Sequence, residues 1–305
     1  MSKKKEKWDC IIVGGGPAGL TAAIYLARFR RNIIVYDTND SRAMRIPISH
    51  NYPGFPAGIS GHALLERLRQ QLQAYNISII NEAVTSLKKL NSDTFVVTGE
   101  HQSTKTRNVL LATGVQDIEP VLPHLNHAIK RGLIRHCPVC DAYEVIDKKV
   151  AVIGYGKSGL GEASFLRDYT SDVTLITLGR QCRWNKQERA ILHDTNITVI
   201  SKPVLDLELL ADCTRCKFAD NKTIDFDYLY SALGSKTNNK LADDVKAKQK
   251  KELLIVNKDQ ETSVTGLYAA GDIVSSLHQL SVATGQAAIA ATAIHNRCRN
   301  YSIPT

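Results

Sequence analysis

Cys10-Ile11-Ile12-Val13-Gly14-Gly15-Gly16-Pro17-Ala18-Gly19, near the start of the chain, is the segment from which the fold class is predicted. Its apolar start predicts a buried strand over 9–13, and the alanine- and leucine-rich residues from Pro17 to Arg28 predict a helix. A second strand is expected over 32–36, which completes a βαβ unit with parallel strands and helices on both sheet faces. The glycines fit G-x-G-x-x-G, a turn that lets the backbone approach a pyrophosphate at a helix N-terminus. Asp37 ends the second strand about 20 residues downstream, where an acid binds ribose hydroxyls, so a dinucleotide site is predicted.

A second unit of the same kind begins near Lys149. A strand is expected over 150–153, a helix over 157–169 and another strand over 173–178, with a second fingerprint, Gly154-Tyr155-Gly156-Lys157-Ser158-Gly159, between the first two. The two fingerprints predict an α/β fold with two Rossmann-like dinucleotide-binding domains, each a parallel central sheet in three layers.

The C-terminal segment Gly266-Leu267-Tyr268-Ala269-Ala270-Gly271-Asp272 is similar to the second FAD motif of flavoproteins that bind two dinucleotides. There an aspartate holds the ribityl chain, and the next helix points its N-terminus at the flavin. Here that helix is expected from about Gln279 to Ala293. The alternative for Asp272 is a turn or helix-cap aspartate. This motif, with the position of the first fingerprint at the start of the chain, favours FAD over NAD at the first site.

Cys137-Pro138-Val139-Cys140-Asp141 lies between the two fingerprints. The cysteine spacing suits a disulfide that closes one helical turn, and its position suggests electrons passing from one cofactor to another and then to sulfur. A carboxylate at Asp141 can protonate the departing thiolate. The alternatives are half of a zinc site, completed by Cys213 and Cys216, or two inert core cysteines. The sequence therefore favours a disulfide oxidoreductase and predicts no metal site.

Composition narrows the class further. The chain has 305 residues, 43% hydrophobic and 23% charged, as in ordinary two-domain proteins. No apolar run is long enough for a membrane span or a signal peptide, and the seven cysteines do not suggest a secreted disulfide framework, so a cytoplasmic location is expected. The net charge of +9 suits an acidic protein partner. No basic stretch is interleaved with aromatics, so nucleic-acid binding is not expected, and the basic run 246–251 is predicted to be a solvated helix end or loop.

These motifs resemble the low-molecular-weight thioredoxin reductases over nearly the whole chain. The first fingerprint, the cysteine pair and Asp272 carry the resemblance, together with Asn51-Tyr52-Pro53-Gly54-Phe55 and Ala112-Thr113-Gly114. The resemblance implies an FAD domain formed by 1–117 and 246–305, with an inserted NAD(P)H-binding-like domain, 118–245, that carries the cysteines. It also implies a homodimer that works by rotating one domain, and a thioredoxin-like protein or small disulfide as the partner.

The same resemblance implies roles for individual residues. Cys140 would face the flavin, Cys137 would exchange with the substrate disulfide, and Asp141 would be the acid. The residues expected to bind FAD are Gly14, Gly16, Pro17, Ala18, Gly19, Asp37, Asn51, Ala112, Thr113, Gly114, Gly271, Asp272, Gln279 and Leu280. The NAD(P)H candidates are Gly154, Gly156, Lys157, Ser158, Gly159, Arg180 and Arg183.

Three departures from the family pattern leave the electron donor open. Pro138, Val139 and Ala142 replace small residues and a glycine around the cysteines, and Tyr155 replaces a glycine of the second fingerprint. The strand over 173–178 lacks the histidine-arginine-arginine cluster that holds the NADPH 2′-phosphate. Losing two hydrogen bonds to a charged group, at roughly 1.5–3 kcal/mol each, would weaken NADPH binding by about 10²- to 10⁴-fold. Arg180 and Arg183 would restore part of this loss.

The leading hypothesis is a thioredoxin-reductase-like flavoprotein that moves electrons between FAD and the Cys137–Cys140 disulfide, with NADPH as donor. One alternative keeps the fold without a working NADPH site, as a dithiol oxidase that passes electrons through FAD to oxygen, or as a reductase fed by acidic ferredoxin. Another is a non-catalytic, flavin-binding redox sensor.

Overall fold

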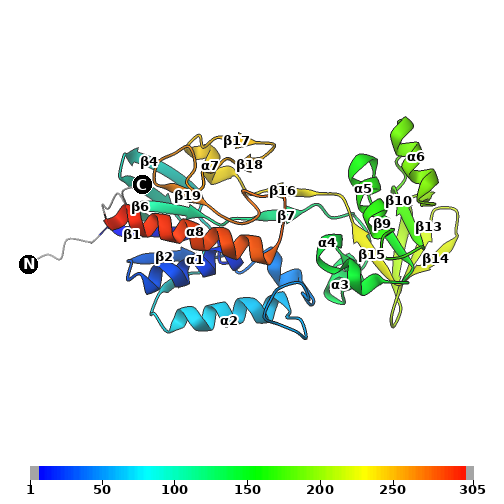
Figure 1. Ribbon diagram of the computed structural model, residues 1–305, viewed down its shortest axis with the longest axis horizontal. Helices are drawn as coiled ribbons and strands as arrows, with labels where there is room; N and C mark the ends of the chain where they lie inside the picture. The colour runs from blue at the N-terminus through cyan, green and yellow to red at the C-terminus, as the bar shows by residue number, and fades with distance from the viewer. Residues whose placement is uncertain (1–6, 300–305) are drawn as a thin grey trace, which may run out of the picture.

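The computed structural model describes residues 7–299, which form two lobes (Figure 1). The lobes are joined by the strands β7 (Val115–Asp117) and β16 (Ser235–Thr237), which pair antiparallel as a two-stranded link. The chain leaves the first lobe through β7 and returns through β16.

The first lobe is built on a seven-stranded sheet in the order β3-β2-β1-β6-β5-β4, with β19 also pairing β6. The strands β1 (Trp8–Val13), β2 (Ile33–Tyr36), β3 (Ser78–Ile80), β6 (Ser103–Leu111) and β19 (Leu267–Ala269) run parallel, whereas β4 (Ser86–Asn91) and β5 (Thr94–Thr98) form an antiparallel extension. The C-terminal β19 therefore completes a sheet that the N-terminal strands begin.

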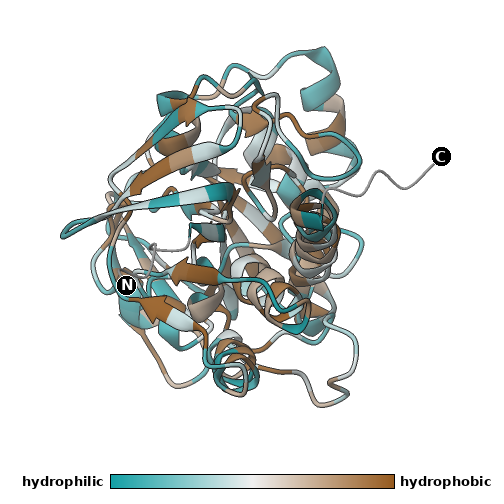
Figure 2. Cartoon of the chain, turned by 90° about the vertical axis from the view of Figure 1, so that its left-hand side faces the viewer, coloured by the Kyte–Doolittle hydropathy of each residue, from teal (hydrophilic) through white to brown (hydrophobic). Residues whose placement is uncertain are grey.

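Each face of this sheet is covered by a different layer. Cys10 and Ile12 of β1 pack toward α1 (Pro17–Arg28), α2 (Gly61–Gln73) and α8 (Leu280–Arg299), whereas Ile11 and Val13 pack on the opposite face, toward α7 (Lys240–Asp244). This alternation follows the two-residue period of a strand. Figure 2 shows hydrophobic residues gathered along the inner strands and helix faces of the lobe, with hydrophilic residues toward its outside.

The second lobe holds a parallel sheet in the order β11-β10-β9-β15-β8. Its strands are β9 (Val150–Ile153), β10 (Val173–Ile176), β11 (Thr198–Ile200), β15 (Tyr228–Ser231) and β8 (Ile134–Arg135). The helix α5 (Gly156–Leu166) packs on one face, with α6 (Lys186–Asp194) beside it. The other face meets α3 (Leu125–Lys130) and an antiparallel sheet of β12 (Val204–Leu209), β13 (Thr214–Phe218) and β14 (Thr223–Phe226).

Short elements complete the chain: the 3-10 turns η1 (Arg42–Arg45) and η2 (Ala142–Val145), the helix α4 (Pro138–Asp141), and the hairpin of β17 (Gln249–Lys250) and β18 (Leu253–Leu254). Within residues 7–299, no helix combines the length and the apolar character that a membrane span requires.

The predicted fold class, two Rossmann-like domains with the second inserted into the first, is confirmed. The division at 117/118 and 245/246 remains a proposal. Leu241 and Ala242 of α7 already pack in the core of the first lobe, which favours a second boundary near β16.

Several predicted elements have different ends in the structure. The strand expected to reach Leu178 stops at Ile176, because a turn follows in which Leu178 and Gly179 both have positive φ. The last helix extends to Arg299 rather than Ala293, and the helix expected to reach Tyr169 ends at Leu166. The basic run 246–251 lies in turns and in β17, after α7.

Candidate active site

The first glycine fingerprint forms a tight turn between β1 and α1. Gly14 has φ +110°, and a Cβ atom there would lie 2.2 Å from the carbonyl oxygen of Ala112. A Cβ on Gly19 would lie 1.8 Å from the carbonyl oxygen of Gly14. Pro17 opens α1 at a position where no backbone N–H is needed. The helix N-terminus is therefore held against the strand ends, with its free N–H groups available to a pyrophosphate, so the turn fits a dinucleotide.

Asp37 lies at the end of β2 and is 4% exposed. Its Oδ1 accepts a hydrogen bond from the Asn39 backbone N–H at 3.1 Å, and its Oδ2 pairs with Arg69 Nη2 at 3.0 Å. A Cβ on Gly15 would lie 2.0 Å from Oδ2, so this variable position of the motif also requires glycine. Sequence reasoning missed Arg69 because no motif links α2 to the end of β2.

One cavity brings together residues from both lobes. It is lined by the predicted FAD residues Gly14, Gly16, Pro17, Ala18, Asp37, Asn51, Ala112, Thr113, Gly114, Gly271, Asp272, Gln279 and Leu280, and also by Cys137, Cys140 and Asp141. Gly19 is the one predicted FAD residue outside this lining, because it packs against Gly14. The cavity therefore places the cysteine pair beside the residues expected to hold FAD.

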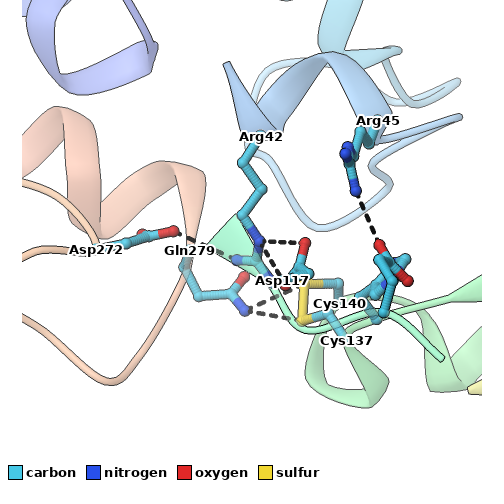
Figure 3. A network of polar contacts seen from close by, with 9 residues as sticks. Arg42, Arg45, Asp117, Cys137, Cys140, Asp272 and Gln279 are labelled. Atoms are coloured by element: carbon cyan, nitrogen blue, oxygen red, sulfur yellow. Dashed lines mark hydrogen bonds and ion pairs between the residues drawn. A yellow bond between two sulfur atoms is a disulfide. The ribbon is translucent and has the colours of Figure 1, made fainter. Parts of the chain in front are cut away.

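Cys137 and Cys140 form a disulfide, with their Cα atoms 5.3 Å apart. Cys137 is the N-cap of α4, and Pro138 follows at the first helical position, where its missing N–H does no harm. The side-chain amide of Gln279, at the start of α8, donates from Nε2 to Cys140 Sγ at 3.3 Å and to Cys137 Sγ at 3.6 Å (Figure 3). The disulfide of the second lobe is thus in polar contact with the first lobe.

Asp141 is held directly beside the disulfide. Tyr230 donates its hydroxyl hydrogen to Asp141 Oδ1 at 2.8 Å, and Arg135 Nη1 lies 3.4 Å from Oδ2. Burial raises the pKa of Asp141, and Arg135 and the Tyr230 hydroxyl offset part of this rise. A raised pKa keeps this carboxyl protonated closer to neutral pH, as a proton donor to a thiolate requires. Tyr230 and Arg135 were not identified from sequence, because they come from β15 and β8.

A half-buried guanidinium, that of Arg42, connects the first lobe to the linking strand. Arg42 of η1 pairs with Asp117 at 2.7 Å through Nη2 and with Asp272 at 3.3 Å through Nη1 (Figure 3). Burial raises the pKa of Asp272, while nearby His278 and Arg42 lower it. Arg42 therefore orients the carboxylate that the sequence assigns to the ribityl chain. Arg42 and His278 lack a motif that would have revealed them.

Two carboxylates and a histidine lie close together at β7, where the chain leaves the first lobe. Ligand atoms of Asp117, Glu119 and His136 lie within 4.8 Å of one another. Arg42 already neutralises Asp117, and Arg45 pairs with Glu119 at 2.8 Å, so this cluster is an ion-pair network.

The second cysteine pair shows no sign of joining the first. Cys216 is fully buried on β13, and burial raises its pKa to about 12. Cys213 and Cys216 are both free thiols, whereas Cys137 and Cys140 are engaged with each other. The geometry therefore disfavours the zinc alternative.

The second fingerprint also forms a close strand–helix turn. A Cβ on Gly159 would lie 2.7 Å from the carbonyl carbon of Gly154, and α5 begins at Gly156 with Lys157 and Ser158 exposed on its first turn. Tyr155 is the N-cap, and the Arg180 guanidinium lies 3.9 Å from the centre of its ring. This turn fits a pyrophosphate, but the stacked side chains of Arg180 and Tyr155 lie beside it.

The end of β10 offers little for a 2′-phosphate. Thr177 and Arg180 close a turn through a backbone hydrogen bond of 3.0 Å and a side-chain bond of 2.6 Å from Thr177 Oγ1 to the Arg180 carbonyl. Two arginines are expected to contribute to binding of the 2′-phosphate. Arg180 is stacked on Tyr155, and Arg183 is exposed. None of the predicted NAD(P)H residues lines the cavity that holds the disulfide.

A dinucleotide cradle and a disulfide that share one cavity define a flavoprotein disulfide oxidoreductase. The comparisons agree: the chain matches the pyridine nucleotide-disulphide oxidoreductase family over residues 8–287 and belongs to it. Within that family it is thioredoxin-reductase-like, FAD-dependent and active on disulfides, as predicted.

Individual relatives support this placement. The chain is 29% identical to a thioredoxin reductase of Treponema pallidum, over 94% of this chain and 95% of that protein. It is 29% identical to a bifunctional thioredoxin reductase/thioredoxin of Mycobacterium leprae, over 93% of this chain and 64% of that protein. The crystal structure of thioredoxin reductase from Streptococcus pyogenes superposes with a TM-score of 0.88 at 25% identity, covering 97% of this chain and 99% of that one.

Proposed function

We propose that this protein reduces the disulfide of a thioredoxin-like protein through Cys137 and Cys140, with NADPH as the electron donor. The observation that carries the proposal is the shared cavity, in which both cysteines line the same space as the residues expected to bind FAD. Bound FAD would supply two-electron transfer between the donor and the disulfide.

The side chains account for the exchange with substrate. The Cys137 thiolate attacks one sulfur of the substrate disulfide, which breaks the substrate S–S bond and releases one substrate thiolate. The Cys140 thiolate then attacks Cys137 Sγ, re-forms the Cys137–Cys140 bond and releases the second substrate thiolate. Asp141, held by Tyr230 and Arg135, supplies a proton to a departing thiolate. Two electrons thus leave the cysteine pair, and the substrate gains two electrons and two protons, one from Asp141 and one from solvent.

A thioredoxin-like partner is supported by the Mycobacterium leprae relative, a bifunctional protein named thioredoxin reductase/thioredoxin. The distribution of charge along the chain limits how such a partner could be attracted. Lys and Arg equal Asp and Glu in number within 118–245, so the whole net charge of +9 lies outside the lobe that carries the cysteines. Recognition at the disulfide would therefore depend on local contacts, and a small disulfide remains a candidate substrate.

The donor is tested by anaerobic mixing of the oxidised enzyme with NADPH or NADH. Rapid loss of flavin absorbance with NADPH is expected, because the α5 N-terminus offers a pyrophosphate site and Arg183 is exposed for a 2′-phosphate. Cys137→Ser should abolish exchange with oxidised thioredoxin. No loss of absorbance with either nucleotide would refute the pyridine-nucleotide route, and partner binding without any exchange would indicate the redox sensor.

A second candidate function is favoured by the Tyr155–Arg180 stack at the second fingerprint. If that stack excludes pyridine nucleotides, electrons enter or leave by another route. One version is a dithiol oxidase that passes electrons from a thiol substrate to oxygen, and another is a reductase fed by acidic ferredoxin, which the positively charged first lobe would attract. Oxygen uptake with added dithiol identifies the first, and flavin reduction by reduced ferredoxin identifies the second.

We also propose a cytoplasmic homodimer. Five cysteines are free thiols, which suits a reducing compartment. Light scattering of the purified holoenzyme tests the oligomeric state, and a monomer at micromolar concentration would contradict it.

A further inference from the structure

Among residues 7–299, the Gln279 side chain is the one group of the first lobe that donates hydrogen bonds to the disulfide. Its Nε2 lies 3.3 Å from Cys140 Sγ and 3.6 Å from Cys137 Sγ, so the two N–H bonds of one amide can each reach a sulfur (Figure 3). A disulfide sulfur is a weak acceptor, whereas a thiolate is a charged one, and hydrogen bonds to charged groups are roughly twice as strong as neutral ones. The contact therefore gains strength when the disulfide is reduced.

The orientation of this amide is set by its neighbours. Gln279 Oε1 accepts a hydrogen bond from Asn51 Nδ2 at 2.9 Å, and Asn51 Oδ1 accepts one from the Ser49 hydroxyl at 3.1 Å. With its oxygen engaged by Asn51, Gln279 presents its NH₂ group to the sulfurs. The reverse orientation would place a carbonyl oxygen against sulfur and would leave two amide nitrogens facing each other.

The geometry points to Gln279 as a catalytic hydrogen-bond donor that stabilises the Cys140 thiolate of the reduced enzyme, with Asn51 as its positioning residue. This assignment rests on the proposed disulfide chemistry and gives Gln279 a role toward sulfur beside its predicted role toward FAD. The shorter distance selects Cys140 as the sulfur that carries the charge in the closed arrangement.

Charged groups around Cys137 and Cys140 also affect the stability of the two thiolates. A test of Gln279 must therefore leave those charged groups unchanged. The ionisable groups that line the same cavity are Asp37, Asp40, Arg42, Arg45, Asp117, Arg135, His136, Asp141, Asp272 and His278. Substituting Gln279 leaves all of them in place, so a difference between variants reports the amide itself.

The experiment equilibrates the holoenzyme anaerobically with mixtures of reduced and oxidised dithiothreitol near neutral pH. The reagent gives up two electrons and two protons and closes to its cyclic disulfide, while the Cys137–Cys140 bond breaks. Cys137 takes one proton, and the other goes to solvent when Cys140 remains a thiolate. Maleimide trapping and peptide mass spectrometry then give the reduced fraction of this pair, separately from the five free cysteines.

Gln279→Leu is expected to shift the equilibrium about tenfold toward the disulfide, which is about 1.4 kcal/mol. Gln279→Glu should shift it further in the same direction, because a carboxylate cannot donate and repels a thiolate. Asn51→Ala should give a smaller shift, because the amide remains but is no longer oriented. Leu277→Ala is the matched control, since this exposed side chain precedes Gln279 in the same segment. FAD absorbance per protein is recorded for every variant.

Equal equilibria for wild type, Gln279→Leu and Gln279→Glu would overturn the inference. The proposed function would survive that result, provided that the wild-type pair still exchanges with oxidised thioredoxin. Conversely, a wild-type enzyme that fails to exchange with thioredoxin or any small disulfide would refute the proposed function, while the dithiothreitol equilibrium would still measure the Gln279 contact.

Discussion

Replacing Gly19 by alanine should weaken FAD binding strongly. The added Cβ would lie 1.8 Å from the carbonyl oxygen of Gly14, a backbone atom that cannot rotate away, whereas real Cβ contacts stay beyond 3.0 Å. The start of α1 would therefore have to move away from β1 by more than about 1 Å. Overpacking of this kind costs about 1–3 kcal/mol. The displaced segment carries the N–H groups expected at the pyrophosphate, so FAD affinity should fall by roughly 10- to 100-fold.

The assay is a titration of FAD into apoprotein, followed by quenching of flavin fluorescence, with far-UV circular dichroism to check folding. Gly285→Ala is the control, because a Cβ at this exposed position of α8 would meet nothing within 4 Å. Gly16→Ala should be intermediate, because its Cβ would lie 3.0 Å from the Ser41 hydroxyl, a side chain that can turn away. Wild-type FAD affinity in a folded Gly19→Ala variant would refute the argument that this turn cradles the cofactor.

Two further predictions concern half-buried acids of the second lobe, Glu162 and Asp141. Burial raises the pKa of Glu162 from 4.5 to about 7. Between these two pH values the folded protein keeps the Glu162 proton, whereas the unfolded chain releases it. The free energy of unfolding therefore falls as the pH rises from 4.5 to about 7. Glu162→Gln should remove this pH dependence of stability and stabilise the protein at pH values above about 7 by up to about 3 kcal/mol. The variant should then have a higher melting temperature than the wild type above about pH 7 but not in mild acid. Equal melting temperatures of variant and wild type at every pH would contradict the prediction. Tyr230→Phe removes a hydrogen bond that favours ionised Asp141, a contribution of about 1.5–3 kcal/mol, so the pKa of Asp141 should rise further. The basic limb of the pH profile for thioredoxin reduction should then move to higher pH, and an unmoved limb would mean that Asp141 is not the acid.

Local features of the chain were sufficient to predict much of the first lobe. The helix expected from Pro17 to Arg28 has those bounds in the structure, because a glycine turn, a proline at the first helical position and an apolar helical face all act within a few residues. The Cys137–Cys140 disulfide is likewise local, since three residues of helix bring the two sulfurs together. The insertion of one Rossmann-like domain into the other was implied by the family resemblance, and the order of the motifs along the chain is consistent with it.

The contacts that shape the chemistry depend instead on the tertiary structure. Gln279 and Cys140 are 139 residues apart, and Arg42 and Asp272 are 230 apart. Such pairs form because β19 and α8 return to the first sheet and because the second lobe places its disulfide against that edge. Their partners have no fixed spacing in sequence, so no periodicity or motif could reveal them.

The elements, the glycine turn and the redox pair could therefore be predicted from the amino-acid sequence, since turn geometry, helix capping and a four-residue disulfide are short-range effects. The folded chain was needed to show that the Gln279 amide faces the sulfurs, that Arg42 orients Asp272 and that the Tyr155–Arg180 stack lies beside the second fingerprint. Those outcomes depend on how distant segments pack, and packing is governed by the shape and burial of the whole assembly of elements rather than by neighbours along the chain.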